Sequence, residues 1–143
     1  MQLGIRKIRY IHASQVDDFS QLPAGATFDF AAFRNGALQE LPFTMDTADF
    51  TENWRYDDNG RYSEVTASAA VRADKELYRP VLQQLAGRKY IFEVELISGV
   101  KYVIGSREFL PTFTYSDGIS GISTNGFTFQ IQNKSLHGAL LTP

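Results

Sequence analysis

The sequence has no cysteine and almost no histidine, and these two shortages exclude several kinds of chemistry. Among 143 residues there is no Cys, which excludes disulfides, thiol nucleophiles, iron–sulfur clusters and zinc–thiolate sites. Only His12 and His137 offer an imidazole, so one chain cannot build a metal site from several histidines. We therefore expect no bound metal and no cofactor.

Excess positive charge and long apolar runs are also missing. The formal net charge is -2, whereas nonspecific duplex binding needs many Lys and Arg side chains on phosphates. No apolar stretch of signal-peptide length follows Met1, and no window approaches the roughly 18 to 20 apolar residues that span a bilayer. The sequence thus predicts no membrane contact and a protein kept in a cytoplasm, or packed into a particle assembled there.

Hydrophobic residues are plentiful, at 43%, and aromatic residues make up 13%. A disordered chain contains far fewer. The length suits one ordinary domain with one core. We expect a single β domain over residues 1–143.

Period-two alternation, bounded by Gly, Asn, Asp and Ser, is the commonest pattern and predicts antiparallel strands. The fold class expected is mostly β, a barrel or a sandwich, with one short α-helix and a long β-hairpin. In the first strand neither face is purely apolar, and Pro111 inside a later strand suggests an edge position or a bulge. The short predicted strands cover residues 5–12, 27–30, 89–97, 100–104, 109–115 and 126–132.

The long hairpin is predicted over residues 43–72, with arms 43–56 and 61–72. Asn59-Gly60 between the arms favours a type I′ turn, which needs positive φ at both central residues. Arms of roughly 12 residues exceed the usual strand length of about 5 to 6. Both faces are poorly apolar, so we expect the hairpin to protrude and to depend on neighbouring subunits for its order.

One helix is predicted over residues 74–86. Its apolar residues recur at helical spacing, and Gly87 follows as a cap. Pro80 predicts that the regular helix begins only near Arg79 or Pro80. The expected core consists of Leu82, Leu85, Phe92, Val94, Leu96, Ile104, Phe113, Phe127 and Phe129.

No residue pattern predicts catalysis. His12 lies near Ser14, and His137 follows Ser135, but neither has the Gly-x-Ser-x-Gly context of a nucleophile elbow. Asp57-Asp58-Asn59-Gly60 lacks the alternating ligands and terminal Glu of an EF-hand. We therefore expect that the chain has no catalytic residues.

Glu93 and Glu95 share a strand face within about 7 Å of each other, a separation that glycosidase carboxylates also use. Such catalytic pairs usually come from different strands across a cleft. Ile91 and Ile97 on the same face indicate partial burial beside Lys or Arg partners instead.

Aromatic and charged clusters predict contacts between subunits. Trp54, Tyr56 and Tyr62 near the hairpin tip could stack on sugars or bases, but packing against each other or against a neighbouring subunit is favoured. Residues 40–64 contain seven acids and two bases, net -5. These charges could be ordinary solvated side chains, or the acidic stretch could meet a basic cluster across a subunit contact and guide assembly. The basic cluster is Arg6, Lys7 and Arg9.

The order of the predicted elements resembles that of the tail tube proteins of long-tailed bacteriophages. The elements are an opening strand, a long hairpin with arms 43–56 and 61–72, a helix over 77–86, and the strand pair 90–96 and 101–104. Neck and other minor virion proteins share that fold. The resemblance implies a non-enzymatic structural protein of the virion, assembled in a bacterial cytoplasm. Its partners would be copies of itself, as in a hexameric ring, and other virion proteins.

The resemblance also implies a mechanism in which stacked rings form a conduit. DNA passes through without specific binding, because an acidic lumen removes the contacts that give affinity. The acid-rich stretch would form the lumen or a face between rings. Two alternatives stay open: a calycin-like barrel for a small apolar ligand, and a carbohydrate-binding sandwich using Trp54, Tyr56 and Tyr62 as its platform.

Overall fold

Antiparallel strands make up most of the chain, which confirms the predicted fold class. A computed structural model describes residues 3–19, 22, 27–44, 47–58, 60–71, 75–119 and 123–142. Its strands are β1 (Leu3–His12), β2 (Gln39–Glu40), β3 (Asp49–Asp57), β4 (Gly60–Val71), β5 (Tyr90–Leu96), β6 (Lys101–Ile104), β7 (Thr112–Ile119), β8 (Ser123–Ser135) and β9 (Leu140–Thr142). The helices are the 3-10 turn η1 (Ala13–Gln15), α1 (Phe30–Phe33) and α2 (Lys75–Leu85).

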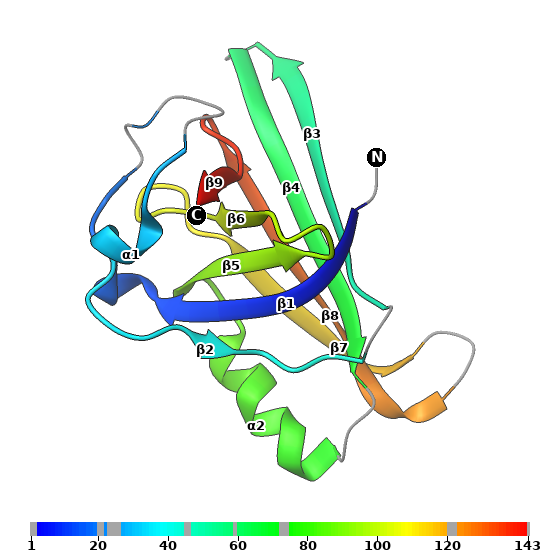
Figure 1. Ribbon diagram of the computed structural model, residues 1–143. Coiled ribbons are helices and arrows are strands. Elements are labelled where there is room, and N and C mark those ends of the chain that lie inside the picture. Colours follow the sequence, from blue (N-terminus) through cyan, green and yellow to red (C-terminus); the bar gives the residue numbers. More distant parts are fainter. Residues whose placement is uncertain are drawn as a thin grey trace.

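One open nine-stranded sheet folds over into two layers, so the molecule is sandwich-like. Sheet A contains β7, β8, β4 and β3 in that order; sheet B contains β1, β5, β6 and β9, with β2 on β1. The beginning of β1 pairs with β3, and the rest pairs with β5, so β1 joins the layers. Figure 1 shows the strands of the two layers crossing steeply.

The space between the layers holds the main core, and every predicted core residue belongs to it. The ring of Phe113 stacks between those of Phe92 and Phe129, at centroid distances of 5.9 and 5.4 Å. A calycin-like barrel would need a ligand cavity in this position. These three rings fill it instead.

A second core lies on the other face of sheet B, beneath the segment that contains α1. There Phe19, Phe28 and Phe30 pack on Ile11 of β1, while Ile8 of β1 lies in the main core. The pairing of β1 with β5 also shifts register between Ile5 and Lys7, so Ile5 and Ile8 both face the main core. Strict alternation therefore mixes the two faces of β1 in sequence. The predicted strand over 27–30 is wrong, because Asp29 caps a helical turn that begins at Phe30.

The helix α2 closes one side of the sandwich below β1 and β5 (Figure 1). It runs from Lys75 straight through Pro80, so the predicted late start is wrong. An interior proline costs about 3 kcal/mol. Burying the large side chains of Tyr78, Leu82 and Leu85 offsets that cost, at about 1.5 to 3 kcal/mol each. Gly87 follows the helix with the positive φ predicted for it, +106°, although its N–H donates to the Phe113 carbonyl and not to the helix.

The predicted hairpin exists as β3 and β4, but it does bury a face, so that part of the expectation is wrong. In β4 every second residue from Ser63 to Val71 is buried, and the same residues are paired with β8. Small side chains make this face look weakly apolar in sequence, although it packs on large rings of the core. The turn also differs, since Gly60 pairs with Asp57 instead of lying inside the turn.

Candidate functional site

The outer edge of β3 is open over most of its length. β1 pairs with it only at Asp49 and Phe50. Backbone groups of every second residue point to the same side, so Glu52, Trp54 and Tyr56 direct N–H and C=O outward as Phe50 does. No strand of the described chain pairs with these three residues.

The opposite edge of sheet A, along β7, is open as well. Phe113 exchanges backbone hydrogen bonds with Gly87, and beyond it no described strand pairs with this edge. Tyr115 and Asp117 share the outward backbone direction of Phe113. The edge position inferred from Pro111 is confirmed, although Pro111 precedes the strand.

The outer face of sheet A is polar, and its charged side chains Arg55, Glu64 and Lys134 are paired with one another toward the hairpin tip. Matching registers place side chains in rows across the strands. One row, toward the hairpin tip, contains Asn53, Glu64 and Lys134; apart from Ala70 and Asp49, the next three rows contain only Ser, Thr and Gln. The rows are Thr51, Thr66, Gln132 and Thr112; then Asp49, Ser68, Gln130 and Thr114; then Ala70, Thr128 and Ser116.

The acid-rich stretch does not form one surface. Glu52, on the inner side of β3, accepts the N–H of Ala139 at 2.7 Å. Glu64, on the outer face of β4, pairs with Arg55 at 2.7 Å and with Lys134 at 3.6 Å. The described acids of this stretch are therefore divided between the two faces of sheet A.

The three aromatic side chains near the hairpin tip point to two different sides. The guanidinium carbon of Arg61 lies 4.2 Å from the centre of the Trp54 ring, and Tyr56, on the same side, is 78% exposed. Tyr62 lies on the other face, beneath Lys134. The three rings do not form the single platform that sugar binding would use, and the tip extends past the other strands (Figure 1).

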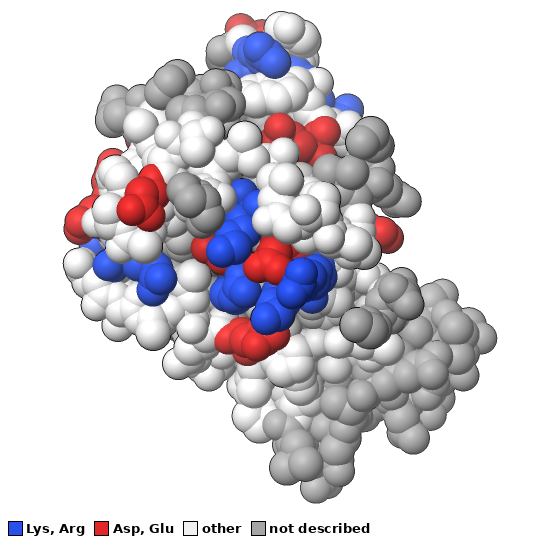
Figure 2. Space-filling view, in the orientation of Figure 1, with Lys and Arg blue, Asp and Glu red and all other residues white. Residues whose placement is uncertain are grey.

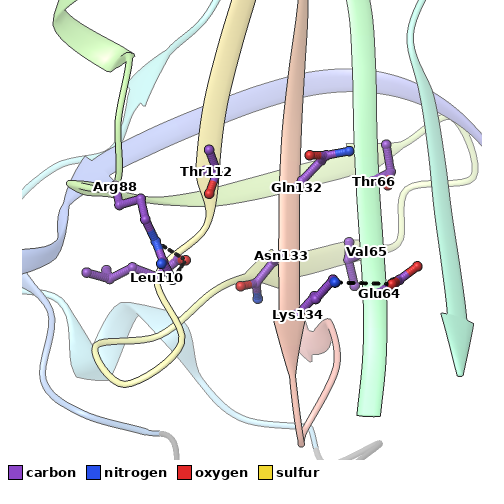
Figure 3. A pocket seen from close by; sticks show the side chains of 9 residues that line it. All are labelled: Glu64, Val65, Thr66, Arg88, Leu110, Thr112, Gln132, Asn133 and Lys134. Carbon is purple, nitrogen blue, oxygen red and sulfur yellow. Dashed lines mark hydrogen bonds and ion pairs between the residues drawn. The ribbon is translucent and has the colours of Figure 1, made fainter. Parts of the chain in front are cut away.

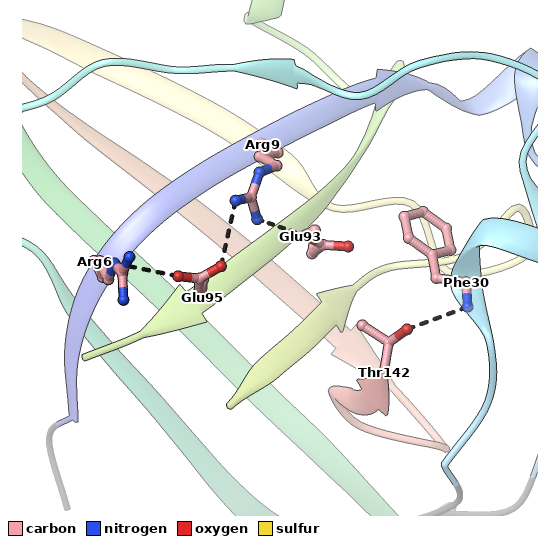
Figure 4. Close-up of polar contacts among 6 residues, drawn as sticks. All are labelled: Arg6, Arg9, Phe30, Glu93, Glu95 and Thr142. Carbon is pink, nitrogen blue, oxygen red and sulfur yellow. Dashed lines mark hydrogen bonds and ion pairs between the residues drawn. The ribbon is translucent and has the colours of Figure 1, made fainter. Parts of the chain in front are cut away.

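The predicted basic cluster is mostly paired within the chain. Arg9 bridges Glu93 at 2.8 Å and Glu95 at 3.3 Å, and Arg6 holds the other oxygen of Glu95 at 3.3 Å (Figure 4). Both carboxylates are buried, so the predicted burial beside Arg partners is confirmed. Lys7 lies opposite Glu95 in register, without a described ion pair.

Each histidine contacts a serine, and neither contacts a described carboxylate. His12 Nδ1 accepts the N–H of Ser14 at 3.1 Å, which caps η1. His137 is 2% exposed, donates from Nδ1 to the Gly138 carbonyl at 2.6 Å and lies 3.3 Å from Ser106 Oγ. Burial lowers the pKa of His137, although the nearby carboxylates of Asp18, Glu108 and Glu52 oppose that shift. His137 and Ser106 are both buried, so a substrate cannot reach them from the surface.

A polar groove of about 440 Å³ crosses β4 and β8 at the start of β7 (Figure 3). Both cations in its lining have partners within the chain. Arg88 donates twice to the Leu110 carbonyl, and Lys134 pairs with Glu64. The amide of Asn133, 5% exposed, has no described partner. Among the described residues no group of three His, Asp or Glu side chains could hold a metal ion.

The described helices are all too short or too polar to cross a membrane. The chain matches no protein-family model, no curated protein and no solved structure in the three comparisons made with them.

Proposed function

We propose that this chain is a non-enzymatic structural protein that assembles with copies of itself, edge to edge, into a ring or tube of the tail tube kind. One observation carries the proposal: both edges of sheet A, β3 and β7, are open along most of their length. Open strand edges are templates for pairing with another chain.

The strand order makes this pairing regular. Neighbouring strands of the four-stranded sheet A are antiparallel, so its two edge strands also run in opposite directions. Joining β3 of one copy to β7 of the next therefore continues the antiparallel pattern. Such a head-to-tail contact repeats from copy to copy and closes into a ring when the rotation allows it.

The same closure determines which face points inward. Sheet B and α2 cover one face of sheet A, so a closed wall of A sheets carries these bulky parts on its outside. The lumen is then lined by the rows of Ser, Thr and Gln and, toward the hairpin tip, by Arg55, Glu64 and Lys134, which pair with one another. Because neutral side chains and cations already paired with a carboxylate release few counterions from phosphates, DNA passes along this wall without specific binding. In this proposal the protein belongs to a virion assembled in a bacterial cytoplasm, with other virion proteins as partners.

Light scattering of the purified chain over a range of concentrations tests the assembly. The wild-type protein should form discrete oligomers or polymers. Tyr56→Pro removes an outward N–H without touching the ladder to β4, so the variant should remain folded by circular dichroism and fail to assemble.

Tyr56→Ala is the matched control, because it removes the ring but keeps the edge N–H. It should still assemble. A wild-type chain that stays monomeric at high concentration, or a Tyr56→Pro variant that assembles as well as wild type, would contradict the proposal.

A further inference from the structure

A second concave site lies between α1 and the outer face of sheet B, away from both edges of sheet A. It encloses about 370 Å³, and its charged lining consists of the cations Arg9, Arg34 and Lys101 and the carboxylates Asp29 and Glu93. Positive charge exceeds negative charge by one. Figure 2 shows Lys and Arg side chains gathered around acidic atoms on this side of the molecule.

Most of the charge in this region is already matched. Glu93 Oε1 accepts from Arg9 at 2.8 Å, and the neighbouring Glu95 is held by Arg9 and Arg6 (Figure 4). The carboxylate of Asp29 accepts the N–H of Ala31 at 3.1 Å, as the cap of α1.

Two cations of the pocket lining, Arg34 and Lys101, have no described carboxylate as a partner. Arg34 donates from Nη1 to the Gly36 carbonyl at 2.7 Å, but its Nε is buried and has no described partner. Lys101 lies between Glu95 and Thr142 in register, yet no described carboxylate pairs with it, because Arg6 and Arg9 already occupy Glu95. A buried donor without an acceptor destabilises a fold, and a charged donor does so more strongly.

We propose that this pocket binds an oxyanion, either a phosphate or the carboxylate of a small molecule, through Arg34 and Lys101. The anion pairs with the ammonium of Lys101 and the guanidinium of Arg34, both in the lining of the pocket, and neutralises the excess positive charge. The planar guanidinium of Arg and the ammonium of Lys are the side chains best suited to that task. The site is closed on one side by the segment that carries α1, which positions Arg34 over sheet B.

Titration calorimetry at constant ionic strength tests the site, with inorganic phosphate and acetate as separate probes. At least one probe should bind with a stoichiometry of one per chain. In Lys101→Gln the affinity should fall about tenfold or more, since a charge-assisted hydrogen bond is lost. Arg34→Lys, which keeps the charge but loses the planar fork, should also weaken binding.

Lys89→Gln is the matched control, because it removes the same charge from an exposed position outside the pocket. It should leave the affinity unchanged. Which probe binds more tightly assigns the anion as phosphate or carboxylate. The inference is overturned if neither probe binds, or if Lys101→Gln and Lys89→Gln have the same effect. Binding does not require assembly, so this result is independent of the proposed function.

Discussion

Single residues on the outer face of sheet B show how buried charge is tolerated in this protein. Glu93 and Glu95 are 6% and 8% exposed, and isolated carboxylates at such positions would be costly. Arg9 reaches both, so one guanidinium offsets much of that cost. The sequence indicated this arrangement, since apolar residues flank the acids on the same strand face. The partners could be predicted only by type, because Arg9 is 84 residues away from Glu93.

Phe129 is the core residue whose truncation we expect to be most damaging. It is 1% exposed and stacks on Phe113 between the layers. Phe129→Ala should lower the free energy of unfolding by about 3 to 5 kcal/mol, measured by chemical denaturation. Leu136→Ala is the control, since Leu136 is 63% exposed, and it should change stability by less than about 0.5 kcal/mol. Equal stabilities of the two variants would contradict the packing of the core.

His137 should make stability depend on pH below its ordinary pKa of 6.5. Burial lowers its pKa in the folded state, so the unfolded chain binds the proton more readily. The free energy of unfolding should therefore fall as pH drops below about 6.5, level off below the folded-state pKa, and not vary above it on account of this group.

Denaturation midpoints across pH 5.5 to 7.5, roughly the range in which histidine titrates, check this expectation. His137→Asn should flatten the dependence, whereas His12→Asn, at an exposed position, should keep it. A His137→Asn variant with the wild-type slope would show that another group is responsible.

At the scale of elements, the strands that the sequence predicts best are those that bury one face locally. β7 and β8 follow this rule, and their alternation predicted their share of the main core correctly. β5 was also predicted, although it is buried on both faces. The segment around α1 could not be predicted, because its burial depends on distant residues: Phe30 donates its N–H to Thr142, 112 residues away. The open edge along β3 could not be predicted either, since strand order is set by contacts across the whole chain, whereas Pro111 gave a local signal for the edge position of β7.

Hydrogen exchange should separate the two strands of the hairpin. β4 lies between β3 and β8, so the amides of residues 63–71 should be protected even in a dilute monomer. The outward amides of Trp54 and Tyr56 should exchange fast in the monomer, because no described strand accepts from them, and slowly in the assembly. Mass spectrometry with electron-transfer fragmentation can resolve these positions. If the two outward amides are already slow in a dilute monomer, edge pairing is not what assembly adds.

The location of β4 also limits which deletions are informative. Removing residues 51–66 would take away positions that pair with β8, so the domain should unfold instead of merely failing to assemble. Substitutions at the edge, such as Tyr56→Pro, test assembly without that loss.

At the scale of the whole molecule, the two faces of the sandwich differ in chemistry. The outer face of sheet B holds a second core and a network of paired charges. The outer face of sheet A is covered mostly by hydroxyl and amide side chains, with the paired charges of Arg55, Glu64 and Lys134 toward the hairpin tip. Such an asymmetry suits a ring whose outside carries the bulky layer and whose inside faces a polyanion that must not adhere.

The rows of Ser, Thr and Gln on the outer face of sheet A lead to the last prediction. Thr66→Lys combined with Gln130→Lys places two cations per copy on the proposed lumen face, at half-buried positions in neighbouring strands. Every copy of a ring contributes them, so an assembled variant should bind duplex DNA, measured by fluorescence anisotropy, whereas wild-type assemblies should not. Each phosphate contact should steepen the dependence of log affinity on log salt by about 0.9.

Ser98→Lys with Val100→Lys adds the same charge at exposed positions in the turn between β5 and β6, away from sheet A. Because these lysines would lie on the outside of a ring, they do not line a common channel, and their contacts with one duplex should be fewer and the salt dependence shallower. Size measurement of both variants keeps a failure of assembly distinct from a failure to bind. The contrary outcome is that intact assemblies with lysines on the outside bind DNA as tightly, and with the same salt dependence, as those with lysines on the proposed lumen face. The position of the lysines would then have no effect, and that result would show that sheet A does not line a conduit.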